Sequence, residues 1–210
     1  MNVPDFKKLP IMGILRGIDK TILRLLTETM ISSGLKTVEL AMNTKDAHLL
    51  IKDMVRLANK KLTIGAGTVL TKDDLKKALD SGASFIVMPI AKEDVVRECV
   101  KKNIPVFPGA FTPTEIYNAW SMGATMVKVF PAKFFGPSYL KEIKAPFNDI
   151  LFLACGGVTP ENIKEFFQNG ASGAAFGGNI FKKQWMNKDN ICFIEENIKN
   201  LIANFKESNR

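Results

Sequence analysis

The chain has 210 residues, of which 46% are hydrophobic and 24% charged, and its formal net charge is +8. This size and composition are typical of one globular domain and exclude a disordered or fibrous chain. No apolar run approaches the ~20 residues that span a bilayer, and the start of the chain resembles no signal segment. We therefore expect a cytoplasmic protein that has no membrane partner.

The basic side chains are scattered in short groups such as Lys60 and Lys61, and they do not form a tail. Aromatic residues do not interleave with them, so a solvated lysine-rich surface is favoured and no nucleic-acid partner is expected. The three cysteines lack CxxC spacing and fit free thiols in a reducing compartment. The single histidine, His48, is expected at the surface, and one histidine excludes a multi-histidine metal site.

Short apolar runs alternate with amphipathic stretches from one end of the chain to the other. We expect eight strands, at residues 11–16, 37–42, 62–69, 85–89, 106–111, 126–131, 152–157 and 174–178. Helix starts are indicated at Thr71, at Thr112 with Glu115, and at Thr159, and residues 191–205 predict a closing helix. Helix ends are indicated by glycines at 34, 82, 123 and 170.

Eight strand–helix units in 210 residues predict a single (β/α)8 TIM barrel domain over residues 1–210. A doubly wound open sheet is the alternative, although no GxGxxG motif follows the first strand. In a barrel, the active site lies at the carboxyl ends of the strands. Residues at and near those ends are therefore the candidates for function.

Lys128 lies between Val127 and Val129 in the sixth expected strand. Because side chains alternate along a strand, Lys128 points into the barrel if the valines face the helices. Burial disfavours the charged amine, so we expect the pKa of Lys128 to be lowered toward neutrality, as a Schiff-base nucleophile requires. A buried ion pair, or a lysine that reaches out of the barrel mouth, is the structural alternative.

Glu39 lies between Val38 and Leu40 in the second strand, so the same alternation turns its carboxylate inward. A buried carboxylate in that place can act as a general acid and base. The alternative is that Glu39 only neutralises Lys128.

Several residues at the ends of other strands could bind an anionic substrate. Arg16 could hold a carboxylate, or it could form only a surface salt bridge. Thr68 follows two glycines and offers a hydroxyl, although this segment could be only a tight turn. The pairs Gly156-Gly157 and Gly177-Gly178 end the last two strands, where barrels often bind phosphate.

Taken together, these segments make the chain resemble the 2-keto-3-deoxy-6-phosphogluconate aldolase family. That family also includes 6-phosphogalactonate and 4-hydroxy-2-oxoglutarate aldolases. The resemblance extends from residue 10 to about residue 181 and rests on PIMGILRG (10–17), VELAMNT (38–44), GAGTVL (65–70), VKVFPA (127–132), FGP (135–137) and GGVTPEN (156–162).

The resemblance implies a class I aldolase that uses no metal or other cofactor. It would cleave a small, phosphorylated 2-keto-3-deoxy sugar acid to pyruvate and an aldehyde such as glyceraldehyde 3-phosphate, in Entner–Doudoroff-type carbohydrate metabolism. By the same resemblance, Lys128 forms the Schiff base and Glu39 is the acid and base. Arg16 and Thr68 lie near the carboxylate, the four glycines bind phosphate, and the chain is a homotrimer.

Asn43, Pro89 and Phe130 complete the expected substrate-binding residues. The chain also departs from the family pattern, since Asn43 stands where many phosphogluconate aldolases have Arg, and Cys155 and Gly178 stand where Thr and Ser are common. Three alternatives follow. They are a 4-hydroxy-2-oxoglutarate aldolase, a phosphate-sugar isomerase or epimerase with Glu39 as base, and a non-catalytic sugar-acid-binding barrel.

Overall fold

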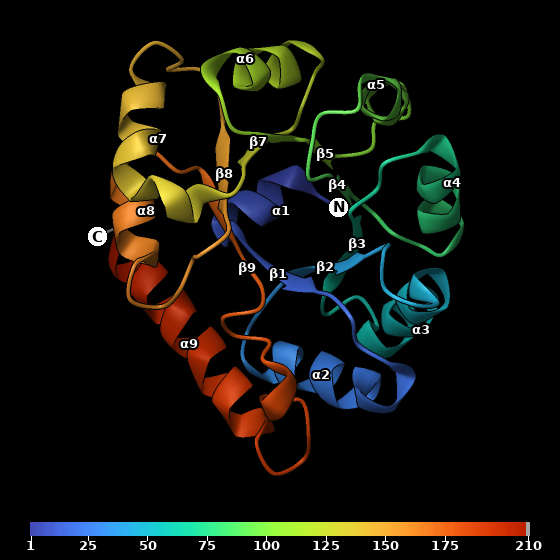
Figure 1. Cartoon of the computed structure of the whole chain (residues 1–210). Helices are drawn as coiled ribbons and strands as arrows, with labels where there is room; N and C mark the ends of the chain where they lie inside the picture. Colours follow the sequence, from blue (N-terminus) through green and yellow to red (C-terminus); the bar gives the residue numbers. More distant parts are fainter. Residues whose placement is uncertain (209–210) are drawn as a thin grey trace.

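Parallel strands surround a central axis and helices pack outside them in the computed structural model, which describes residues 1–208 (Figure 1). The strands are β1 (Ile11–Leu15), β2 (Thr37–Ala41), β3 (Thr63–Gly67), β4 (Ile86–Val87), β5 (Val106–Phe107), β6 (Gly109–Ala110), β7 (Val127–Val129), β8 (Phe152–Cys155) and β9 (Gly173–Phe176). Their order is β5-β4-β3-β2-β1-β9-β8-β7-β6, and every pairing is parallel.

The two outermost strands of this order are consecutive pieces of one chain segment, which closes the sheet into a barrel. β5 pairs with β4, β6 pairs with β7, and Pro108 separates the two pieces. Proline has no N–H group and interrupts the ladder, but its carbonyl accepts a hydrogen bond of 2.8 Å from the Lys128 amide. The predicted strand at 106–111 is thus β5 and β6 together, and the predicted barrel is confirmed over the doubly wound sheet.

The helices follow the strands as the sequence predicts. They are α2 (Lys20–Ser32), α3 (Ala47–Ala58), α4 (Lys72–Asp80), α5 (Glu93–Lys101), α6 (Pro113–Ser121), α7 (Gly136–Lys144), α8 (Ile163–Gln168) and α9 (Ile191–Ser208), with short 3-10 turns η1 (Ala132–Phe134) and η2 (Lys183–Trp185). None of the helices over residues 1–208 has both the length and the apolar character needed to cross a membrane.

The predicted helix starts are confirmed at two of three positions. Thr71 caps α4, and Thr112 forms the expected capping box with Glu115 at the start of α6. The prediction for Thr159 is wrong, because α8 begins only at Ile163. A turn precedes it, in which the Asn162 side chain accepts a hydrogen bond of 2.8 Å from the Thr159 amide.

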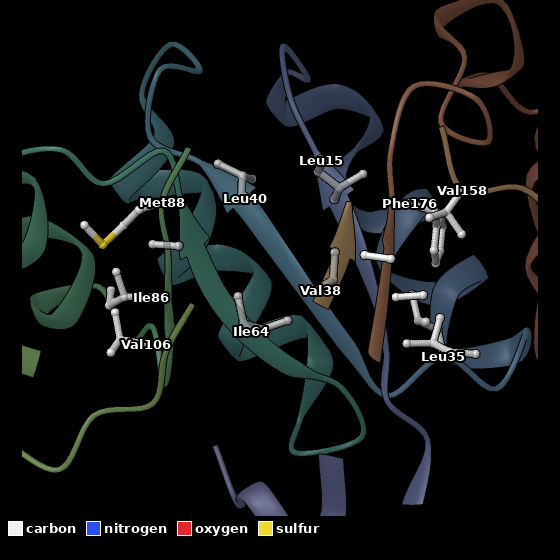
Figure 2. Packing of buried hydrophobic residues seen from close by; sticks show 14 of the residues in the cluster. Leu15, Leu35, Val38, Leu40, Ile64, Ile86, Met88, Val106, Val158 and Phe176 are labelled. Atoms are coloured by element: carbon white, nitrogen blue, oxygen red, sulfur yellow. The ribbon is translucent and has the colours of Figure 1, made fainter. Parts of the chain in front are cut away.

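Apolar side chains on alternate strand positions fill the layer between barrel and helices. Val38 and Leu40 of β2 lie in this layer, as do Ile64 of β3 and Val106 of β5 (Figure 2). Residues on the opposite strand face form a second buried cluster inside the barrel, which includes Met12, Phe85, Phe107, Met126 and Leu153. This alternation leaves inward positions on β2 and β7 for polar side chains.

A short first helix, α1 (Val3–Lys8), lies across the amino-terminal end of the barrel (Figure 1). Its Phe6 is buried in the interior cluster and packs edge-on against Phe107, with ring centroids 5.8 Å apart. The sequence pattern does not predict this helix, because six residues are too few to show helical periodicity. α1 covers the floor of the barrel, so access to the interior is from the carboxyl ends of the strands.

Candidate active site

Lys128 and Glu39 face each other across the barrel interior. Lys128 is on β7 and Glu39 on β2, and three strands separate them along the sheet. Their flanking residues Val127, Val129, Val38 and Leu40 pack in the outer layer, which confirms that both charged side chains turn inward. Lys128 Nζ lies 4.0 Å from Glu39 Oε1, and the two residues are only 5% and 1% exposed.

Glycine in β3 makes room for the Glu39 carboxylate. A Cβ atom at Gly67 would lie 2.7 Å from both Cδ and Oε1 of Glu39, so a side chain at that position would displace the carboxylate. Glu39 Oε2 is buried and has no hydrogen-bond partner among the described residues. Burial raises the pKa of Glu39, while the positive charges of Lys128 and Arg16 oppose this rise.

Lys128 has a different electrostatic balance from the one that the sequence predicts. Burial alone would lower the pKa of Lys128, but the interactions of the amine with Cys155 and Glu39 favour the ammonium form, and the resulting pKa is raised. The predicted lowering is therefore wrong. The sequence revealed the burial of Lys128, but it could not reveal which groups from β2 and β8 surround the amine.

Arg16 and Thr68 meet at the mouth of the barrel, although they are far apart in the sequence. Arg16 Nη2 donates a hydrogen bond of 3.4 Å to Thr68 Oγ1. Thr68 has a φ of 56°, a left-handed conformation that is costly for a β-branched residue. The fold therefore holds the Thr68 hydroxyl beside the Arg16 guanidinium against a local backbone preference.

A cavity of about 280 Å³ opens above Lys128 at the carboxyl ends of the strands. Nine predicted site residues line it: Arg16, Thr68, Pro89, Lys128, Phe130, Gly156, Gly157, Gly177 and Gly178. Asn43 does not line it. The chain turns after β2, where the Thr44 amide donates to the Ala41 carbonyl at 2.9 Å, and Asn43 is exposed to solvent.

Two glycine loops form one wall of this cavity. Gly156 and Gly157 follow β8 with φ values of 92° and 85°, which favour glycine. The Asn162 side chain holds this loop, since its Nδ2 donates a hydrogen bond of 2.8 Å to the Gly157 carbonyl. Gly178 follows β9, and a Cβ atom there would meet nothing within 4 Å.

Five further lining residues were absent from the sequence-based site. They are Ile14, Cys155, Val158, Asn179 and Phe181. The signal for Cys155 was present, because it alternates with Leu153, another inward residue of β8. Phe181 lies beyond the last expected strand, and no strand periodicity could have placed it.

This arrangement suits covalent binding of a keto acid. An amine and a carboxylate lie together inside an apolar barrel, and a guanidinium and a hydroxyl at its mouth can bind a carboxylate. Glycine loops at the same end line the cavity, and the backbone amides of such loops can bind an anion. Within residues 1–208, no group of three His, Cys, Asp or Glu side chains could hold a metal ion.

Comparisons with known proteins agree with this architecture. A family model for KDPG and KHG aldolases matches residues 4–197. The chain is 36% identical over 176 residues to the 2-dehydro-3-deoxy-6-phosphogalactonate aldolase of Escherichia coli K12, covering 83% of this chain and 86% of that protein. It is 31% identical over 142 residues to the 2-dehydro-3-deoxy-phosphogluconate aldolase of Treponema pallidum, covering 67% of each. A solved structure described as "Native KDPGal structure" superposes with a TM-score of 0.88 at 32% identity over 96% of both chains.

Proposed function

This chain belongs to the KDPG and KHG aldolase family, and we propose that it cleaves a 6-phosphorylated 2-keto-3-deoxy sugar acid through a Schiff base on Lys128. It is an aldolase, a carbon–carbon lyase that releases pyruvate and an aldehyde. Family membership favours this function over an isomerase or a non-catalytic binding barrel. The observation that carries the mechanism is the buried pair of Lys128 and Glu39, 4.0 Å apart beneath the cavity.

The reaction begins when neutral Lys128 attacks the C2 ketone of the substrate. Glu39, directly or through a water, protonates the C2 oxygen, and loss of water from the carbinolamine gives an iminium ion. Glu39 then accepts the proton of the C4 hydroxyl while the C3–C4 bond breaks. The electrons of that bond pass into the iminium and give an enamine. The aldehyde leaves, the enamine is protonated at C3, and hydrolysis releases pyruvate and regenerates Lys128.

The raised pKa of Lys128 requires that its ammonium lose a proton before the attack. Glu39 is the acceptor in reach, and burial raises its pKa as well. Burial disfavours both charges and so lowers the cost of moving the proton from Lys128 to Glu39, a transfer that activates the nucleophile and readies the acid together. On this proposal Glu39 does more than neutralise Lys128.

The remaining site residues position the substrate. Arg16 and Thr68 bind the substrate carboxylate at the barrel mouth, and the loops at 156–157 and 177–178 bind the terminal phosphate through backbone amides. Pro89 and Phe130 provide an apolar wall beside the reacting carbons. No catalytic role is assigned to Asn43, which is exposed outside the cavity.

We propose the galactonate-type substrate as the first candidate, because the relative named for it is 36% identical and spans most of both chains. The test measures pyruvate release from the 6-phosphogalactonate and 6-phosphogluconate epimers of the 2-keto-3-deoxy acid and from 4-hydroxy-2-oxoglutarate. Preference for the galactonate epimer supports the proposal. Preference for either other compound reassigns the substrate, and absence of cleavage of all three overturns the proposed function.

We further propose a cytoplasmic homotrimer. The family resemblance implies a trimer, and exposed apolar side chains such as Ile90, Phe134 and Phe135 supply surface that association could cover. Three chains of 23.3 kDa predict a mass of about 70 kDa in light scattering, whereas a mass near 23.3 kDa would contradict association. Three free cysteines fit a reducing compartment.

A further inference from the structure

Positive charge is distributed unevenly in the active-site cavity. Its two cationic side chains, Arg16 and Lys128, both act on the Glu39 carboxylate and so lie at that end. The wall at the ends of β8 and β9 consists of the two glycine loops, where Asn179 is the polar side chain that lines the cavity. A substrate phosphate carries a charge of about −1.5 to −2 at neutral pH, so backbone amides alone would leave this charge without a cationic partner.

The base of the Lys133 side chain lies against one of these glycine loops. It belongs to η1, which follows β7 on the carboxyl side of the barrel. A Cβ atom at Gly157 would lie 2.5 Å from Lys133 Cβ and 3.3 Å from its Cα, so Lys133 packs directly on the loop. The flexible four-carbon stem of lysine gives the ammonium group a wide range from this anchor point.

The Lys133 ammonium has no strong partner to hold it elsewhere. Among residues 1–208 it forms no ion pair, and its Nζ lies 5.2 Å from the ring centroid of Phe134, which is 69% exposed. Such a cation–π contact in water is worth only about 0.5–1 kcal/mol. By contrast, Lys182, which follows the Gly177-Gly178 loop in the chain, lies 4.1 Å from the Trp185 ring. Lys133 can therefore turn toward a bound anion.

We propose that Lys133 binds the terminal phosphate of the substrate and so determines the preference of this enzyme for phosphorylated sugar acids. The inference rests on the proposed function and extends it by naming a specificity-determining residue. Gly178 offers no side chain to the phosphate, and Lys133 supplies the missing interaction from the neighbouring loop. Arg16 and Lys128 are then free to bind the carboxylate and to form the Schiff base.

The experiment compares KM and kcat of wild type, Lys133→Ala, Lys133→Glu and Lys133→Arg. Each is assayed on the phosphorylated substrate and on the same sugar acid without phosphate. Lys141→Ala is the matched control, because Lys141 is also an exposed lysine and lies on the following helix α7, away from the atoms that pack on Gly157. Trapping of pyruvate on each variant with borohydride reports on the intact Schiff-base site independently of phosphate.

The proposal predicts that Lys133→Ala raises KM for the phosphorylated substrate about three- to tenfold, the range between an exposed ion pair and a charge-assisted hydrogen bond. Lys133→Glu raises it further, Lys133→Arg restores it, and KM for the unphosphorylated acid stays constant in all variants. Equal changes for both substrates, or no change for either, overturn the role of Lys133. Those results leave the proposed aldolase function intact if the wild-type protein cleaves the sugar acid and is trapped with pyruvate. Failure of the aldolase proposal would instead appear as a wild-type protein that does neither.

Discussion

Replacement of Gly67 by alanine tests whether the position of the Glu39 carboxylate matters for catalysis. The new Cβ would lie 2.7 Å from Cδ and Oε1 of Glu39, and ordinary contact begins at 3.4 Å, so the carboxylate must retreat by at least about 0.7 Å. Glu39 is buried, and the nearby amine of Lys128 depends on its position. The substitution therefore moves one end of the proposed catalytic pair while every catalytic group is retained.

The expected effect on activity exceeds the effect on stability. Overpacking of this size costs about 1–3 kcal/mol of folding free energy. A misplacement approaching 1 Å at a reacting group can cost about 100-fold in rate, and we expect kcat of Gly67→Ala to fall by about 10- to 100-fold. Steady-state release of pyruvate measures kcat, and thermal unfolding followed by circular dichroism measures stability.

Gly173→Ala is the matched control. Its Cβ would lie 3.0 Å from Leu153 Cδ1, a similar crowding within the barrel but remote from the Glu39 carboxylate. The control should lose stability and keep kcat within about twofold, since only a structural contact changes. A Gly67→Ala variant that lost stability but kept the kcat of wild type would show that catalysis does not depend on the position of Glu39.

Three other predictions concern the pH response, the phosphate loop and the thiols. Burial raises the pKa of Glu39 in the folded state above its ordinary 4.5. The protonated carboxyl therefore stabilises the fold fully below pH 4.5, and this stabilisation is lost as the pH rises through the pKa of the folded state. The Tm of Glu39→Gln should therefore rise relative to that of wild type as the pH is raised from acidic to slightly alkaline. A Tm difference that calorimetry finds constant over this range would contradict the prediction. Gly178→Ser should leave Tm unchanged, because its Cβ meets nothing within 4 Å, and should lower KM for a phosphorylated substrate; a higher KM would argue against phosphate at this loop. Ellman's reagent should modify exposed Cys192 in the native protein but not buried Cys99, whose pKa burial raises to about 12, and simultaneous reaction of both would contradict the packing.

Much of the barrel could be predicted from the sequence because its strands and helices alternate with clear periodicity. The same alternation placed Val127 and Val129 outward and Lys128 inward, and the structure agrees. The glycine pairs were predicted at the cavity for a related reason, since barrel geometry brings the ends of successive strands together. Local pattern and fold geometry were sufficient for these residues.

Other features depend on contacts between distant segments, which a sequence pattern does not contain. The raised pKa of Lys128 depends on Cys155 and Glu39 from other strands. The role of Gly67 became visible only when the Glu39 carboxylate was seen against it. Asn43 was expected in the site, but a turn after β2 leaves it in solvent. The order in which residues meet across the barrel is a tertiary property.

Covalent capture of pyruvate is the most direct test of a Schiff base on Lys128. The protein is incubated with pyruvate, reduced with borohydride and digested, and the peptides are mapped by mass. A Schiff base on Lys128 predicts one reduced pyruvate adduct, on the peptide that contains Lys128, and no adduct on folded Lys128→Ala. Absence of an adduct on folded wild-type protein, or an adduct on another lysine only, would contradict the Schiff-base mechanism.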